Sequence, residues 1–118
     1  MYSVIALRDF AFTADNSTMY AVGDFTTIGG TTINRVAKWN GTAWSALGTG
    51  AANTVFSVIV SSDGGLVIGG GFTTTGGVTT NYVAKWNGTA WSSFGNGLYG
   101  TVYSVAEYSH QYYVSGTF

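Results

Sequence analysis

The side chains that could catalyse a reaction are few in this 118-residue chain. Glycoside hydrolysis would need two carboxyl groups held about 5 to 9.5 Å apart. Five carboxylates are available for such a pair: Asp9, Asp15, Asp24, Asp63 and Glu107. None recurs at equivalent repeat positions: Asp24 is replaced by Gly71 and Thr117, and Asp63 is explained by a Ser-Asp-Gly-Gly turn. The carboxylates therefore predict no hydrolytic site.

Metal and nucleophile chemistry have little more support. His110 is the single histidine and falls in a predicted turn, where a lone histidine is more often solvated than a metal ligand. The chain has no Cys, which removes disulfides, Cys-ligated metals and thiol nucleophiles. No Ser lies in an elbow motif, and the Gly-rich stretches lack the GK[ST] ending of a phosphate loop. We therefore expect no catalytic residue, no metal and no cofactor.

Uncharged polar loops offer better chemistry for binding. Stretches 26–34 and 73–81 are rich in Thr, Gly and Asn, and stretch 95–101 adds an aromatic ring. Hydroxyl and amide groups beside such a ring suit sugars, and equally suit a hydrated protein contact. The candidate ligand-binding residues are Thr27, Thr32, Asn34, Thr74, Thr79, Asn81 and Tyr99. The alternative is that Gly29-Gly30 and Gly76-Gly77 only satisfy positive-φ turns, while the threonines keep the loops soluble.

An internal repeat determines which elements carry these loops. Residues 25–50 read FTTIGGTTINRVAKWNGTAWSALGTG and residues 72–97 read FTTTGGVTTNYVAKWNGTAWSSFGNG, so that 19 of 26 positions are identical at an offset of 47. The flanking segments repeat more loosely, and a third, incomplete unit ends the chain. Repeats of this length indicate one supersecondary unit used several times.

Each unit is predicted to hold four short β-strands, because segments rich in Val, Tyr, Trp and Thr alternate with Gly, Asn and Asp clusters. In the order of the four strand positions, the predicted strands are 2–7, 55–60 and 102–108; 19–23, 66–70 and 112–115; 35–39 and 82–86; and 42–47 and 89–94. Alternating strand direction then places the loops 26–34, 73–81, 48–54 and 95–101 at one end, which we expect to carry no charge.

The third and fourth strands are predicted to form a hairpin in each unit. The dipeptides Asn40-Gly41 and Asn87-Gly88 are typical of two-residue type I′ turns, in which both residues have positive φ. That turn would place Trp39 opposite Thr42 and Ala37 opposite Trp44. The tryptophans Trp39, Trp44, Trp86 and Trp91 are predicted to anchor the sheets, together with the turn residues Asn40, Gly41, Asn87 and Gly88.

Both faces of such a sheet would be apolar. Trp39 and Trp44 fall on one face, whereas Val36, Ala43 and Leu47 fall on the other. A sheet that is apolar on both sides must be covered on both sides, and four-stranded sheets stacked around an axis achieve this with one repeated unit. No segment has the period of an amphipathic helix. The predicted fold is all-β, with β-propeller blades of four antiparallel strands.

The order of these parts resembles Kelch-like propeller repeats of the pattern GGxFTxxGGxxxNxVAKWNGxxWxxLG. The resemblance covers both complete units and the final half unit, although the link 8–18 between the first two strands is longer than its counterparts. It implies a surface, adhesion or interaction scaffold, and some related propellers are enzymes such as galactose oxidase. The copper chemistry of those oxidases needs a Cys crosslinked to Tyr, which this chain lacks.

The chain provides about two and a half blades: 1–50, 51–97 and the half blade 98–118, which holds only the first two strands. Propellers usually close with about 4 to 8 blades. We therefore expect closure either by homo-oligomerisation or within a longer polypeptide. The last strand would leave an edge that must be paired, swapped or left frayed, and we expect that edge to be used.

Composition argues against nucleic acid and membrane as partners. Charged residues make up 8% of the chain and the net charge is -1, whereas globular domains average about 25% charged residues. Four Lys and Arg residues provide no patch for nucleic acid or anionic membrane, no apolar run reaches the length of a membrane span, and the N-terminus lacks the basic start of a signal peptide.

The sequence thus predicts a non-enzymatic propeller scaffold for structural assembly or multivalent surface recognition, at an extracellular or particle surface. The partners expected are further copies of itself, a glycan or a surface protein. One alternative is a fragment of a longer propeller enzyme, a hydrolase, lyase or oxidase, whose active site lies outside this chain. Another is a recently duplicated chain selected for folding and assembly only.

Overall fold

The computed structural model describes residues 7–94 and 97–117. All the elements in that part of the chain are β-strands, and every pairing between them is antiparallel. The strands are β1 (Leu7–Phe12), β2 (Met19–Gly23), β3 (Thr27–Ile28), β4 (Thr31–Thr32), β5 (Val36–Trp39), β6 (Trp44–Ala46) and β7 (Val55–Val60). They continue with β8 (Leu66–Gly70), β9 (Thr74–Thr75), β10 (Val78–Thr79), β11 (Val83–Trp86), β12 (Trp91–Ser93), β13 (Val102–Tyr108) and β14 (Gln111–Gly116). The all-β prediction is confirmed.

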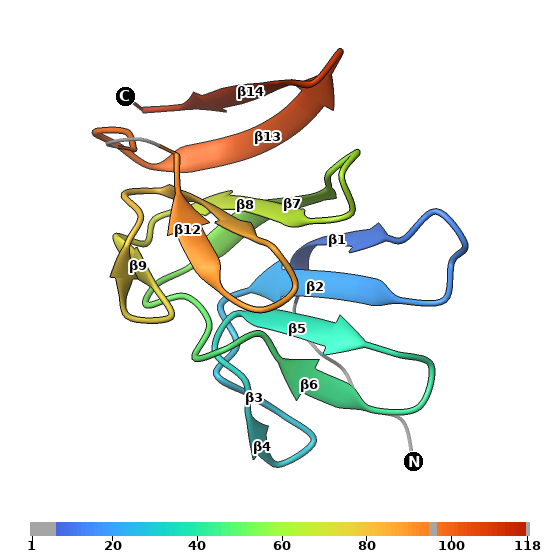
Figure 1. Ribbon diagram of the computed structural model, residues 1–118. Coiled ribbons are helices and arrows are strands. Elements are labelled where there is room, and N and C mark those ends of the chain that lie inside the picture. The colour runs from blue at the N-terminus through green and yellow to red at the C-terminus, as the bar shows by residue number, and fades with distance from the viewer. Residues whose placement is uncertain (1–6, 95–96, 118) are drawn as a thin grey trace.

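The strands form three layers (Figure 1). The first sheet has the order β1-β2-β5-β6, and the second has the same order of parts, β7-β8-β11-β12. The third layer is the hairpin β13-β14. Two small hairpins, β3-β4 and β9-β10, project from the loops that follow β2 and β8.

The second sheet is covered on both faces, as its two-sided apolar pattern predicts. One face packs on the first sheet through a cluster that includes Val36, Leu47, Leu66, Ile68 and Trp91. The other face packs on the hairpin β13-β14 through a second cluster. That cluster contains Val67, Val83, Val102 and Val105, with Ile59, Tyr82, Phe94, Leu98, Tyr112 and Val114 packed against it. The core therefore lies between the layers.

Two hydrogen bonds to polar side chains, the Asp9 lock and the Ser57 lock, join the first strands of the three layers. The backbone N–H of Val58 donates to the Asp9 carboxylate at 3.1 Å, and the N–H of Val105 donates to Ser57 Oγ at 3.2 Å. Asp9 and Ser57 occupy the same place, because each follows an irregularity in strand pairing at the start of β1 or β7. One side chain of each layer thus bonds the backbone of the next, which gives the apolar stacking a defined lateral register.

The predicted first strand is misplaced. Residues 2–6 lie outside the described residues, and the predicted link 8–18 is wrong because Arg8–Phe12 belong to β1. The equivalent of Phe56-Ser57-Val58 is Arg8-Asp9-Phe10, since both segments start with the same pairing irregularity. Two consecutive charged residues are typical of a loop in sequence. Here Arg8 lies over the Phe56 ring, and the Asp9 carboxylate accepts a backbone N–H of β7.

The predicted type I′ turns are also wrong. Gly41 and Gly88 have positive φ, whereas Asn40 and Asn87 do not. Each Asn carboxamide oxygen instead accepts two backbone N–H groups, which come from Thr42 and Ala43 in the first unit. The turn therefore spans four residues and Trp39 pairs with Trp44 directly. A register change of two residues leaves every side chain on its predicted face.

The small hairpins were predicted only as loops. Gly29 and Gly30 have φ of 58° and 82°, and Gly76 and Gly77 have φ of 57° and 80°. These values match the predicted positive-φ turns and the type I′ geometry that lets two strands pair across two residues. Segments of two residues are too short for a strand pattern to be read from sequence.

Substitution of Gly50 tests how tightly the loop after β6 is held. Gly50 has a φ of 72°, and a Cβ there would overlap the carbonyl oxygen of Asn34. We expect Gly50→Ala to lower the free energy of unfolding by about 3 kcal/mol, because left-handed strain and a backbone clash add. Urea unfolding followed by tryptophan fluorescence measures this loss.

The matched control is Gly77→Ala. Gly77 has a φ of 80° but nothing lies within 4 Å of its added Cβ. Its loss should be only the conformational part, about 1 kcal/mol. Equal losses at the two positions would contradict the packing described for Gly50.

Candidate functional site

Of the loops predicted to share one end of the sheets, 26–34, 48–54 and 73–81 do so, while residues 95–96 of the fourth lie outside the described residues. The Asn34 carboxamide donates to the carbonyl oxygen of Thr49 at 3.2 Å. Across to the second sheet, the N–H of Ala52 donates to Thr74 at 3.1 Å and the N–H of Gly76 donates to Gly50 at 2.8 Å. The loop after β6 is thereby held between the loop after β2 and the hairpin β9-β10.

A polar groove lies among these loops. It is lined by Asn34, Arg35, residues 49–52, Thr74, Gly76 and Gly77. The Arg35 guanidinium reaches into it and donates to the carbonyl oxygen of Ala51 at 3.1 Å. The expectation of an uncharged end is therefore wrong: sequence assigned Arg35 to a strand, whereas its φ of 67° turns it into the loop end.

The seven residues predicted to bind a ligand do not converge on one site. Asn34 and Thr74 line the polar groove. Thr27 and Thr32 are exposed on β3 and β4, and Thr79 is exposed on β10. Asn81 repeats a backbone contact of Asn34. The carbonyl oxygen of Asn34 accepts the N–H of Ala51, and that of Asn81 accepts the N–H of Leu98, both at 3.1 Å. Tyr99 is 94% exposed and does not line the polar groove.

At the opposite end the structure joins three residues that sequence kept apart. Glu107 accepts both the N–H and the hydroxyl of Ser62, at 2.8 and 2.6 Å, and His110 Nδ1 lies 3.3 Å from the same hydroxyl. These bonds from Ser62 lower the pKa of Glu107. In a catalytic triad the imidazole lies between hydroxyl and carboxylate. Here the hydroxyl donates to the carboxylate directly, so the arrangement ties the β7-β8 turn to β13-β14.

A second ionic contact lies beside this turn. Lys85 pairs with Asp63 and also lies over the Tyr112 ring, 5.8 Å from its centroid. The hydrogen bond from Lys85 is the main reason that the pKa of Asp63 falls to about 2. The N–H of Gly65 donates to the same carboxylate at 3.0 Å, as the Ser-Asp-Gly-Gly composition predicts for a turn. Both carboxylates at this end therefore organise the turn.

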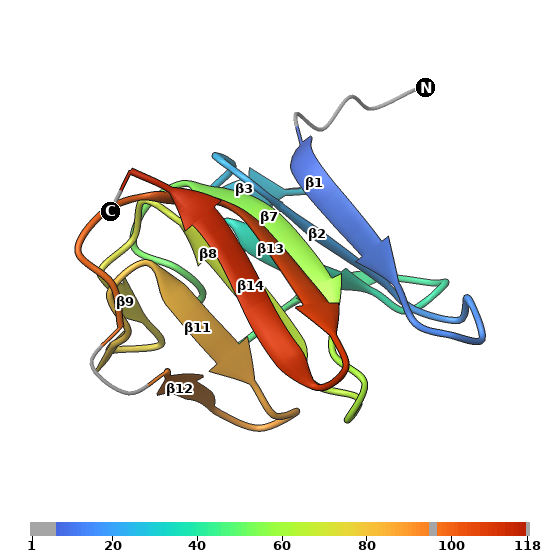
Figure 2. The same ribbon diagram turned by 90° about the horizontal axis from the view of Figure 1, so that it is seen from above.

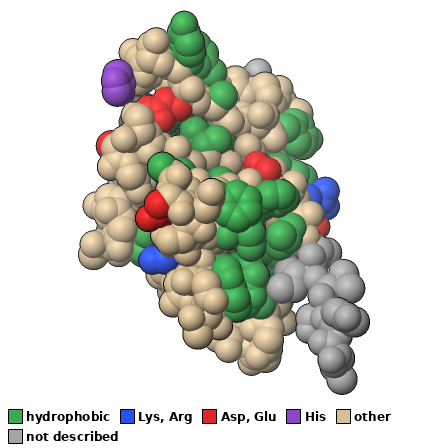
Figure 3. All heavy atoms as spheres, turned by 90° about the vertical axis from the view of Figure 1, so that its right-hand side faces the viewer, with side chains coloured by type: hydrophobic (Ala, Val, Ile, Leu, Met, Phe, Trp, Pro, Cys, Tyr) green, Lys and Arg blue, Asp and Glu red, His purple; other side chains and the backbone are tan. Residues whose placement is uncertain are grey.

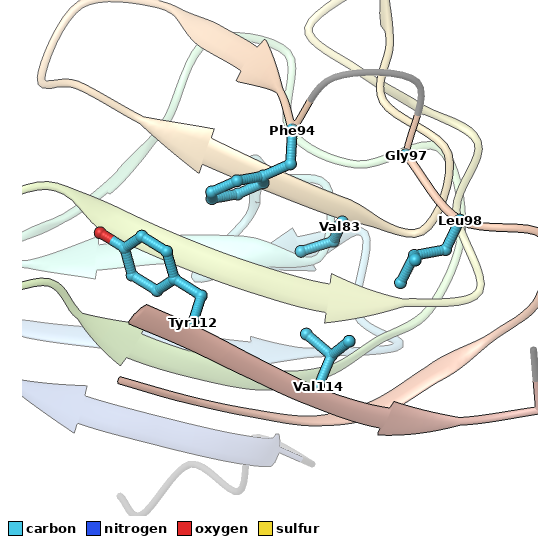
Figure 4. A pocket seen from close by; sticks show the side chains of 6 residues that line it. All are labelled: Val83, Phe94, Gly97, Leu98, Tyr112 and Val114. Carbon is cyan, nitrogen blue, oxygen red and sulfur yellow. The ribbon is translucent and has the colours of Figure 1, made fainter. Parts of the chain in front are cut away.

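The third feature is an apolar groove on the second sheet. Seen from above, β13-β14 lies over β7 and β8 and leaves β11 and β12 to one side (Figure 2). The groove at this step is lined by Val83, Phe94, Gly97, Leu98, Tyr112 and Val114, and all of these except the glycine direct their side chains toward it (Figure 4). Phe94 and Tyr112 meet edge to face, with ring centroids 5.3 Å apart.

The same place is filled between the first two sheets. Val36, Leu47 and Ala51 precede Val83, Phe94 and Leu98 by 47 residues, and there they pack against Trp91. Trp91 is 6% exposed, and its indole N–H donates to the carbonyl oxygen of Leu47 at 2.9 Å. Among the described residues, β13 and β14 form a sheet of two strands, so no third and fourth strands there provide such a ring.

The outer face of the first sheet shows the complementary deficit. Phe12, Met19, Trp39 and Trp44 lie in line across it, on the side away from the second sheet. Phe10 and Phe12 are 54% and 49% exposed. Trp44 is only half-buried and, among the described residues, its indole has no acceptor. Figure 3 shows hydrophobic side chains clustered on the face that it draws, with single charged groups between and around them.

Comparison of the chain with protein-family models, curated proteins and solved structures gave no match. The resemblance to Kelch-like repeats therefore stays a prediction. Among residues 7–94 and 97–117, no three His, Cys, Asp or Glu side chains gather as a metal site would require. The same residues include no helix that could cross a membrane.

Replacing tryptophan by phenylalanine at positions 91 and 44 compares the stability contributed by a buried ring with that of a half-buried one. In monomeric protein, Trp91→Phe should lower the free energy of unfolding by about 2 kcal/mol, because it removes a buried hydrogen bond and part of a packed ring. Trp44→Phe is the matched control, and we expect it to cost less than about 1 kcal/mol. Denaturant unfolding of both variants provides the comparison, and a larger loss for Trp44→Phe would contradict the burial described.

Acid should remove the contribution of Glu107. Its pKa is lowered in the folded chain, so its bonds to Ser62 stabilise the fold above the usual glutamate range and are lost as pH falls through the lowered value. We expect Glu107→Gln to have a lower Tm than the parent near pH 7, and the difference to shrink toward about pH 2. A Tm difference that does not change with pH would contradict this account.

The matched control for that titration is Asp15→Asn. The pKa of Asp15 is also lowered, to about 2, but its partners Ser17 and Thr13 belong to the same turn. Amide exchange in β13-β14 should rise in Glu107→Gln and stay at the parent rate in Asp15→Asn. Faster exchange in both variants would place the effect in overall stability rather than at the Ser62 contact.

Proposed function

We propose that this chain is a non-enzymatic β-propeller scaffold for structural assembly or surface recognition, Kelch-like in its repeat. The observation that carries the proposal is the contrast between Trp91 and Trp44. The face that carries Trp91 packs on a neighbouring repeat unit, whereas no other repeat unit within residues 7–94 and 97–117 packs on the equivalent face that carries Trp44. An apolar sheet face with aromatic residues left open is typical of an assembly surface.

The packing between units supports a ring. Each contact joins non-identical faces of successive units, because the Asp9 and Ser57 locks run in one direction through the layers. Contacts of this heterologous kind produce closed rings or open filaments. Closure into a propeller would cover both open ends with the contacts that already join the first and second sheets.

Recognition would take place at the loop end. The polar groove presents hydroxyl, amide and guanidinium groups that suit a glycan or a protein surface. Repetition of such loops around a ring would raise avidity without a strong single site. An extracellular or particle surface is the proposed location for a scaffold of this kind.

The test of assembly is the solution mass, measured by light scattering on a size-exclusion column. We expect a discrete multiple of 12.3 kDa. A charge on the open face should then return the mass to that of one chain, because an unpaired ammonium would be buried in an apolar contact. The variant is Phe12→Lys, at a half-exposed position of β1.

The matched control is Tyr99→Lys, which adds the same charge on a fully exposed loop residue. It should assemble like the parent chain. A folded monomer at every concentration, or assembly that survives Phe12→Lys, would overturn self-assembly through this face.

A further inference from the structure

The groove lined by Val83, Phe94, Gly97, Leu98, Tyr112 and Val114 has a filled counterpart in the same chain, so its natural occupant can be identified. At the counterpart, the ring of Trp91 fills the space beside Val36 and Leu47. Trp91 arrives there on the strand pair β11-β12, next to Trp86, with the two ring centroids 5.1 Å apart. The apolar groove therefore corresponds to a position that, elsewhere in the same chain, receives a tryptophan from a strand pair.

The hydrogen-bond acceptor for that tryptophan is already in place. Leu47 accepts two N–H groups through its carbonyl oxygen, one from Gly50 at 3.1 Å and one from the Trp91 indole at 2.9 Å. Phe94 is its equivalent, and its carbonyl oxygen accepts the N–H of Gly97 at 2.9 Å. A carbonyl oxygen has two lone pairs, so Phe94 can accept an indole N–H as well.

The edge of β14 can also accept an added strand. In the second sheet, β8 pairs with β7 on one side and with β11 on the other. Among the described residues, β14 pairs with β13 alone. Its second edge offers backbone groups to an added strand, which is a common mode of peptide recognition. Apolar groove and edge adjoin, since Tyr112 and Val114 belong to both.

We propose that the apolar groove and the β14 edge together bind a two-stranded hairpin with two tryptophans, of the type Val-Ala-Lys-Trp-Asn-Gly-Thr-Ala-Trp, supplied by another repeat unit. The first strand of the hairpin adds to β14 and the second tryptophan enters the apolar groove, with its indole N–H on the carbonyl oxygen of Phe94. This inference rests on the proposed scaffold function and names the partner of its incomplete layer.

The internal repeat also sets the register of the added strand. In the second sheet Trp86 pairs with Leu66 and Ala84 pairs with Ile68. Tyr112 and Val114 follow Leu66 and Ile68 by 46 residues. The first tryptophan of the incoming strand should therefore lie opposite Tyr112 and its alanine opposite Val114. A shift by one residue would turn the tryptophans away from the groove.

The probe is a synthetic peptide with the sequence of residues 81–94, carrying a fluorophore and added to the full chain. We expect saturable binding in fluorescence anisotropy, and amide-exchange protection confined to β14 and the groove residues. Peptide W91A should bind at least about tenfold more weakly, because a buried aromatic anchor carries much of the energy of such contacts.

Two variants of the chain provide matched controls. Val114 faces the apolar groove and Tyr113, its neighbour on β14, faces the other way and is 56% exposed. Val114→Ser should weaken peptide binding about tenfold, and Tyr113→Ser should leave it within about twofold of the parent. Circular dichroism of both variants shows that the chain remains folded.

Failure of this inference is distinguishable from failure of the proposed function. Absence of saturable binding, equal binding of the W91A peptide, or protection that maps outside β14 overturns the hairpin site. Assembly that depends on Phe12 can still be found in the light-scattering measurement, and the scaffold function then stands. Peptide binding by a chain that never assembles would support the hairpin site and overturn self-assembly.

Discussion

Burial of both faces of each four-stranded sheet is the constraint on which the rest of this structure depends. With 8% charged residues and 46% hydrophobic residues, the chain has little charge to cover an exposed sheet face. The second sheet satisfies the constraint because the first sheet lies on one side and β13-β14 on the other. Within the described part of the chain its two neighbours do not, and the surfaces left without a covering layer are the face around Trp44 and the apolar groove beside Phe94. The fold and the proposed assembly thus follow from one physical requirement.

Directional bonds decide how the layers sit on one another. Apolar contact alone tolerates sliding, whereas the Asp9 and Ser57 locks and the Trp91 indole each demand one backbone partner. The Asp9 and Ser57 bonds join the first strands of the layers, whereas the Trp91 indole comes from the fourth strand of the second sheet. Hydrogen bonds at two separate places oppose both sliding and rotation of one sheet over the next. A new unit that repeated the same bonds would be placed equally well.

Sequence predicted the parts of the fold in which pattern and packing agree. The strands Met19–Gly23, Val55–Val60, Leu66–Gly70 and Val102–Tyr108 were predicted with the bounds that the structure has. The first strand was misplaced because Arg8 and Asp9 make contacts to the next layer that no local pattern reveals. Ser62, Glu107 and His110 meet only through the stacking of layers, so their contact also lay beyond sequence. The apolar groove could have been found by asking which repeat positions lack their usual neighbour.

Differences between the two complete units concentrate at the loop end, whereas the strand pair that carries the tryptophans is conserved between them. The strand segment from Val36 to Ser45 is identical to the segment from Val83 to Ser92, as two-sided burial and a shared turn require. The loop end differs: Arg35 corresponds to Tyr82, and the buried pair Ile28 and Ile33 corresponds to Thr75 and Thr80, whose hydroxyls bond each other at 3.3 Å. The apolar pair of the first unit is thus matched in the second by a pair of hydroxyl groups that bond each other. The strands therefore keep the units interchangeable for stacking, while the loops would let each unit present its own chemistry to the proposed partner.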